Sequence, residues 1–106
     1  MANGVLGRVS LASTTLTTVY TVPVSTLAYV NINVANRTAS NAAVRIALAQ
    51  TAGSPSDAEY IEYDSFVAPN GVIERTGLVI DAGWSVVAFS DKANVSVQAY
   101  GIEQTS

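Results

Sequence analysis

Acidic side chains crowd into one short stretch of the sequence, DAEYIEYD at residues 57–64. Asp57, Glu59, Glu62 and Asp64 lie there, and the whole chain has only eight acidic residues. Carboxylates at this density could form the acid–base pair of a glycoside hydrolase, the oxygen ligands of a Ca²⁺ ion, or the solvent-facing side of a β-strand. These three interpretations make different demands on spacing and on the neighbouring residues.

The hydrolase interpretation depends on the distance between two carboxyls. On a regular strand Glu62 and Asp64 would share one face, about 6.5–7 Å apart, with Glu59 on the opposite face. A retaining glycosidase holds its carboxyls about 5–5.5 Å apart and an inverting one about 6.5–9.5 Å apart. The spacing permits an inverting pair, but a chain of 106 residues has little room for a cleft with aromatic sugar platforms.

Metal and nucleophilic chemistry find little support elsewhere in the chain. The segment lacks the Gly-containing ligand loop of an EF-hand, and the sequence has neither histidine nor cysteine. Without histidine no serine or threonine can belong to a Ser-His-Asp triad, and a Ser–Lys dyad would have to use Lys92, in the turn SDKAN. We therefore expect no enzyme activity, no cofactor and no metal site.

The solvent-facing strand is the favoured interpretation, and it requires a partner for the carboxylates, because they cannot be buried unpaired. Pro69-Asn70-Gly71 has the composition of a tight turn, and a hairpin there would place Arg75 beside the acidic strand. Trp84 begins another strand and is typical of a core plug or an interface anchor. The candidate interaction residues are Glu59, Glu62, Asp64, Arg75 and Trp84.

The elements that position these residues are predicted to be short strands. Apolar residues alternate with polar ones along most of the chain; Val30, Ile32 and Val34, for example, alternate with Asn31 and Asn33. The predicted strands cover residues 5–12, 16–22, 27–36, 42–50, 58–67, 72–80, 84–90 and 94–102. About eight strands spaced roughly ten residues apart predict a single all-β domain over residues 1–106, a β-sandwich or a jelly-roll-like fold, with loose arms at 1–4 and 103–106.

Composition narrows the classes of partner. Only 12% of the residues are charged, the net charge is −3, and the five basic residues are scattered, so we expect no nucleic-acid footprint. The start MANGVLGRVS has no apolar signal-peptide core, and no run approaches the length of a membrane span. We therefore expect neither classical secretion nor a membrane partner. A surface so poor in charge suits a protein that lies against other proteins.

Three segments carry a resemblance to a known group of proteins. Thr18–Pro23 (TVYTVP), Asp57–Asp64 and Asn70–Gly83 are similar in type and order to segments of small virion proteins of tailed bacteriophages, including phages of cyanobacteria. The resemblance runs along nearly the whole chain, although it consists of strand and turn patterns. Trp84 departs from the group, in which that position is usually more polar, and this leaves its role open.

The resemblance implies a non-enzymatic structural protein. Members of the group include head decoration or cement proteins, which assemble as trimers on the outside of the capsid, and components of tails or fibres. It implies a homotrimer in the virion, assembled in the host cytoplasm, with the major capsid protein as partner. The alternatives are a tail or fibre component that contacts the host surface, and a small carbohydrate-binding or Ca²⁺-binding β module.

Overall fold

The structure is a computed structural model that describes residues 3–51 and 53–105, which form eight strands and one short 3-10 helix. Each predicted strand overlaps an observed one, so the prediction of an all-β chain is confirmed. The elements in chain order are β1 (Asn3–Leu11), β2 (Thr17–Thr21), β3 (Thr26–Asn36), β4 (Ala42–Ala49), η1 (Asp57–Glu59), β5 (Tyr60–Val67), β6 (Val72–Ile80), β7 (Ser85–Ser90) and β8 (Val95–Thr105).

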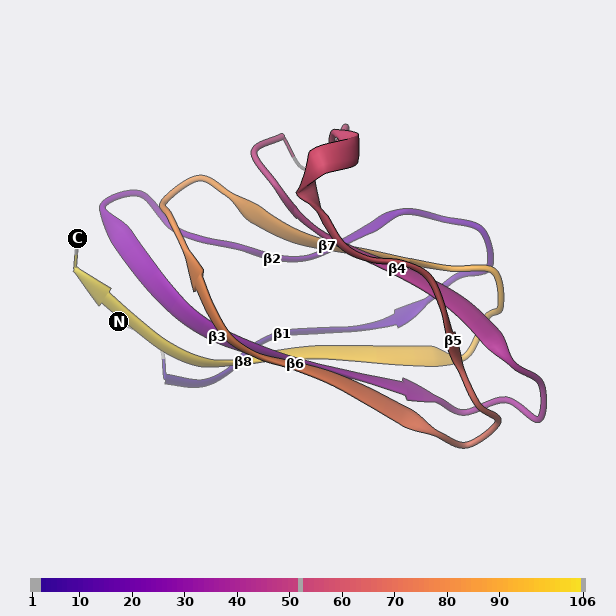
Figure 1. The fold of residues 1–106 in the computed structure, drawn as a ribbon. Helices are drawn as coiled ribbons and strands as arrows, with labels where there is room; N and C mark the ends of the chain where they lie inside the picture. The colour runs from indigo at the N-terminus through magenta and orange to yellow at the C-terminus, as the bar shows by residue number, and fades with distance from the viewer. Residues whose placement is uncertain (1–2, 52, 106) are drawn as a thin grey trace.

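The strands form two antiparallel sheets that pack face to face as a sandwich (Figure 1). Sheet A has the order β1-β8-β3-β6, and sheet B has the order β2-β7-β4-β5. Strands β1 and β2 therefore form one edge of the sandwich, and β6 and β5 form the other. Each sheet has an inner face that lines the core and an outer face that points away from it.

The core lies between the sheets and consists mainly of β-branched residues and alanine. On β3, Val30, Ile32 and Val34 are at most 1% exposed, whereas Asn31 and Asn33 between them are partly exposed, as the alternation predicted. Val, Ile and Ala at these positions pack well on a pleated surface, because their side chains are short or branched close to the backbone. This interior packs between the two sheets and holds their inner faces together.

Part of the outer face of sheet B is also buried. Ala47 follows the core residue Ile46 and would face solvent on a half-exposed strand, yet it is fully buried with Ala49 and Val87. Leu16 and Tyr60 pack against them. Figure 1 shows η1 and the adjoining loop above this face, near β4 and β7. Sheet B is thus partly covered on its outer face, which explains why the outward residues Ala47, Ala49 and Val87 of its central strands are apolar.

The connection from β5 to β6 differs from its prediction. Strand β5 pairs with β4 in sheet B, and β6 pairs with β3 in sheet A. The prediction of a hairpin at Pro69-Asn70-Gly71 is therefore wrong. The Gly71 N–H donates to the Ala68 carbonyl over 2.8 Å, and Asn70 has φ 58°. Proline at the first central position holds φ near −65°, which excludes the primed turns that keep two strands in register. The chain therefore crosses from sheet B to sheet A.

A buried asparagine holds this crossing. Asn36 at the end of β3 is 2% exposed, and its amide group donates to the carbonyls of Val67 and Ala68 in the crossing and to that of Ser40. Its side-chain oxygen accepts from the backbone N–H and the hydroxyl of Thr38. Because every polar atom of this amide has a partner, burial carries no unpaired-group penalty. Asn36 thus connects the β3–β4 turn to the β5–β6 crossing.

The prediction of loose terminal arms is wrong for the residues that the structure describes. Residues 3–4 belong to β1, and residues 103–105 belong to β8, which pairs with β3 as far as Thr105 opposite Thr26. Residues 1, 2 and 106 of the predicted arms lie outside the described residues. Glu103 accepts a hydrogen bond from the partly buried hydroxyl of Tyr20 on β2, and burial together with this carboxylate raises the pKa of Tyr20. The contact connects the two sheets and orders the end of β8.

Candidate functional site

The four carboxylates of residues 57–64 do not converge. Glu59, Glu62 and Asp64 each bond to different groups, and among the residues that the structure describes no three acidic side chains gather into a metal-binding cluster. Register shifts between β4 and β5 and a φ of 54° at Asp64 break the period-two alternation. Glu62 and Asp64 consequently do not share a face, and their expected i, i+2 pairing is wrong.

Glu62 and Arg75 form an ion pair between the edge strands β5 and β6. Their pairing positions, opposite the core residues Ile46 and Ile32, turn both side chains towards the inside of the sandwich. The Glu62 side chain is 10% exposed, and its carboxylate also accepts a hydrogen bond from the Ser65 hydroxyl. Arg75 was correctly predicted as a partner of the acidic segment, although the contact crosses between sheets. Inward-pointing charges of this kind protect sheet edges from pairing with other chains.

Replacing Arg75 with alanine should destabilise the fold. The variant leaves the nearly buried Glu62 carboxylate with the Ser65 hydroxyl and without its cation, and an uncompensated buried group costs about 1–3 kcal/mol. Chemical denaturation followed by the fluorescence of Trp84 would measure the change in the free energy of unfolding. Arg45→Ala is the matched control, because it breaks an ion pair on the solvent side and should cost less. Equal stability of Arg75→Ala and the parent would show that the Glu62–Arg75 ion pair does not stabilise the fold.

Asp64 lies on the outer side of sheet B and pairs with Arg45 of β4, with Nε 2.6 Å from Oδ1. The Arg45 guanidinium lies over the rings of Tyr63 and Phe89, at 4.3 and 4.9 Å from their centroids. This guanidinium lowers the pKa of Asp64 because it hydrogen-bonds to the ionised carboxylate. Sequence reasoning missed Arg45 as a partner, since only the bulged register brings it opposite residues 63–64.

Glu59 closes the loop before β5. Its carboxylate accepts the backbone N–H groups of Ser56 and Gln50, at 2.9 and 3.1 Å, and these bonds lower the pKa of Glu59. The carboxylate thereby holds η1 against the end of β4. Glu59 acts as a local cap, and its carboxylate has no bonding partner in common with Glu62 or Asp64.

Trp84 lies away from the acidic strand, after the turn that follows β6. It is partly buried against the core, and with Leu48, Val79, Ile80 and Asp81 it lines a shallow hollow of about 200 Å³. Its carbonyl accepts the Val22 N–H over 2.9 Å, and its own N–H donates to the Asp81 carbonyl over 3.2 Å. The structure therefore supports a packing role for the indole, and it does not bring Trp84 together with the other candidate residues.

An exposed apolar row crosses the outer face of sheet A. Val79 on β6, Tyr29 on β3 and Ile102 on β8 are direct cross-strand neighbours, and they are 59, 37 and 46% exposed. The same-face pairs on either side, Leu27 with Gln104 and Asn31 with Tyr100, carry no charge. We call Val79, Tyr29 and Ile102 the apolar row. The alternation along β3 places Tyr29 on the outer face of its sheet, but only the strand order places the three side chains together.

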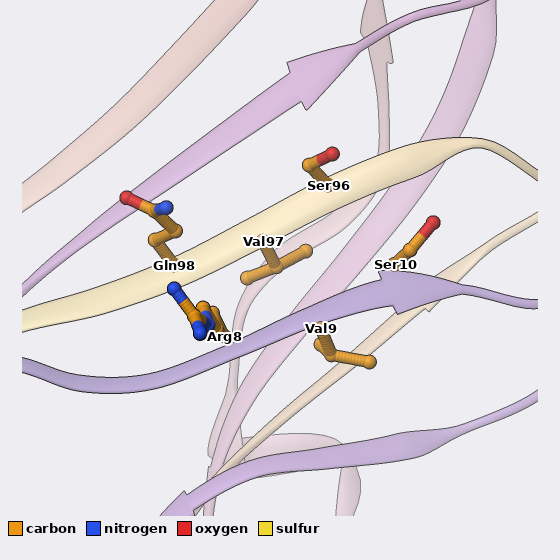
Figure 2. A pocket seen from close by; sticks show the side chains of 6 residues that line it. All are labelled: Arg8, Val9, Ser10, Ser96, Val97 and Gln98. Atoms are coloured by element: carbon orange, nitrogen blue, oxygen red, sulfur yellow. The ribbon is translucent and has the colours of Figure 1, made fainter.

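The other end of this outer face is polar and cationic. Arg8 and Ser10 on β1 lie opposite Gln98 and Ser96 on β8, and these residues line an open cavity of about 380 Å³ (Figure 2). Arg37, beyond the end of β3, donates from Nε to Ser96 Oγ and from Nη2 to Ser10 Oγ, both at 2.7 Å. We call Arg8, Ser10, Arg37, Ser96 and Gln98 the arginine cradle. Its members were not among the predicted interaction residues.

Comparisons with known proteins identify no relative. No protein-family description, curated protein or solved structure matches this chain. Among the described residues, the structure contains no helix that is both long and apolar enough to span a membrane.

Proposed function

We propose that this chain is a non-enzymatic structural protein of a tailed-bacteriophage virion. In this proposal it is a decoration protein that binds the outside of the head as a homotrimer, with the major capsid protein as partner. Assembly would take place in the host cytoplasm. The observation that carries the proposal is the apolar row, which is exposed on the outer face of sheet A.

The apolar row favours association because it is exposed and reaches the edge of its sheet. Val79 belongs to β6, the edge strand, so the row runs from the sheet edge across β3 to β8. A partner that covers it would bury apolar surface at roughly 25 cal/mol per Å². Uncharged neighbours on the same face lower the desolvation cost of such a contact. A second and third copy of the chain are the proposed occupants, because closed cyclic assembly covers the same patch on every subunit.

The remaining surface is consistent with a binding role. The acidic side chains with the greatest functional promise on sequence, Glu59, Glu62 and Asp64, are engaged in capping and ion pairs. A trimer with three weak footholds on a shell can gain about 10²–10⁴ in avidity over one foothold. The net charge of −3 fits an exterior position, since a partner of packaged DNA would carry a basic face. The resemblance to small phage virion proteins points in the same direction.

Phage particles that lack this protein should assemble and infect normally under mild conditions, yet release their DNA at a lower temperature than complete particles. A ligand that binds only the assembled shell stabilises it by RT ln(1 + [L]/Kd), about 2.7 kcal/mol at a hundredfold excess over Kd. A dye that reports released DNA during heating measures the difference, and adding back the purified protein is the control. Intact heat resistance with failed adsorption to the host would replace this proposal with a tail role.

A further inference from the structure

We propose that the arginine cradle binds a phosphate monoester group. In the described part of the chain, the three ion pairs use Arg45, Arg75 and Lys92, so Arg8 and Arg37 are the basic residues without a carboxylate partner. Both contribute to the arginine cradle. Within the described residues, this acidic protein thus has its two unpaired arginines at one place on its surface.

The hydrogen bonds within the cradle leave mainly donors for a ligand. Arg37 donates to the oxygens of Ser10 and Ser96, so the hydroxyl protons of both serines point elsewhere. Within residues 3–51 and 53–105, neither hydroxyl donates a hydrogen bond to another protein group. Arg37 keeps further N–H groups, and Arg8 adds a second guanidinium with no hydrogen-bonded partner of its own in these ranges. A site of this composition requires a ligand rich in acceptors.

Register explains why these groups converge. Arg8 pairs with Gln98, and Ser10 pairs with Ser96, so the four side chains form two adjacent rows on the outer face of β1 and β8. Figure 2 shows Arg8 and Gln98 at one end of the cavity and Ser10 and Ser96 at the other, with the backbone of Val9 and Val97 between them. The Arg37 guanidinium bridges the serine end. That guanidinium donates hydrogen bonds to serines on two strands, which hold it in place before any ligand arrives.

The ligand charge follows from the two guanidinium groups. A phosphate monoester carries close to two negative charges near neutral pH and three strong acceptor oxygens, and arginine binds such oxygens in paired, charge-assisted hydrogen bonds. A carboxylate offers one charge and two oxygens. A phosphodiester of nucleic acid also has one charge per group, and two arginines are too few for a nucleic-acid footprint. The cavity of about 380 Å³ leaves room for the organic part of an ester.

The cradle is separate from the apolar row, so this chemistry does not depend on how the chain assembles. Ser96 and Gln98 lie four to six residues before Ile102 on β8, which is roughly 13–20 Å along a strand. Occupation of the cradle would therefore leave the apolar row free. Failure of trimer formation would not affect the cradle proposal, and failure of phosphate binding would not affect the proposed assembly.

Amide chemical shifts of the ¹⁵N-labelled protein test the proposal during titration with inorganic phosphate and with glucose 6-phosphate at constant ionic strength. We expect saturable shifts centred on Ser10, Ser96 and Gln98 with both probes. Acetate and dimethyl phosphate, which carry a single charge, should bind about tenfold more weakly, and glucose should produce no shift. Binding of inorganic phosphate but not of glucose 6-phosphate would overturn the ester assignment. Equal responses to acetate and phosphate would overturn the requirement for a dianion.

Arginine-to-glutamine variants supply the matched comparison. Arg8→Gln and Arg37→Gln should each weaken phosphate binding about tenfold or more, because each removes charge-assisted hydrogen bonds. Arg45→Gln makes the same chemical change on the outer face of sheet B and should bind phosphate as the parent does. Circular dichroism verifies that each variant is folded. An equal loss of phosphate affinity in all three variants would show that only the net charge of the protein matters, which would overturn the site. Unchanged phosphate binding by Arg37→Gln would also overturn it.

Discussion

Replacing Ile102 with aspartate should convert a trimer in solution into a single chain of 11.0 kDa. Ile102 is at one end of the apolar row, beside Tyr29, and the proposed assembly buries both. An ionised carboxylate without a partner in such an interface costs several kcal/mol, which is more than the net free energy that holds a small interface together. Light scattering coupled to size-exclusion chromatography measures the mass directly.

The isolated fold should tolerate this substitution. Ile102 is exposed in the single chain, and surface changes of this kind typically alter stability by no more than about 0.5 kcal/mol. Phe66→Asp is the control, since Phe66 is 76% exposed on the outer face of sheet B, away from the apolar row. Dissociation by Phe66→Asp rather than Ile102→Asp would move the interface to sheet B. A parent protein of single-chain mass at micromolar concentration would contradict the trimer altogether.

Replacing Gly101 with alanine should be the most destabilising single-methyl change in sheet A. Gly101 lies within β8, opposite Gly4 on one side and Val30 on the other, and its φ is 151°. A Cβ atom there would fall well inside van der Waals contact with the carbonyl oxygen of Tyr29, which is backbone and cannot rotate away. We expect a loss of about 3 kcal/mol, at the upper end for overpacking.

Thermal unfolding provides the measurement. For a domain of this size each kcal/mol shifts the midpoint by about 4–8 °C, so Gly101→Ala should melt on the order of 15 °C below the parent. Gly53→Ala is the matched control, because a Cβ at Gly53 meets no atom within 4 Å. A midpoint within a few degrees of the parent would show that β8 can move away from β3 without cost.

The secondary structure of this protein was largely readable from its sequence. Valine, isoleucine and alanine at alternate positions predict strands, because period two is a local property of a half-buried sheet. Val30, Ile32 and Val34 face the core as that pattern requires. The period-two pattern failed at two positions. Ala47 is buried on the outer face, where Tyr60 packs against it. The positive φ at Asp64 turns its carboxylate towards Arg45.

Side-chain partnerships were only partly readable. Arg75 was predicted as the partner of the acidic segment, and it does pair with Glu62, but through the gap between two sheets rather than across a hairpin. Pro69 decides this difference, since its fixed φ excludes the turn that would have paired β5 with β6. Glu59, Glu62 and Asp64 were grouped by proximity in sequence, and the structure assigns each to a different neighbour.

What the sequence determined by itself is therefore the class of structure and the scarcity of catalytic groups, because both follow from composition and local pattern. What only the tertiary structure decided is which surfaces exist. The apolar row joins residues from β6, β3 and β8, and the arginine cradle joins Arg8 and Ser10 to Ser96 and Gln98, more than eighty residues later in the chain. Their convergence depends on strand order and register, which arise from long-range packing of the whole core and leave no local pattern in the sequence.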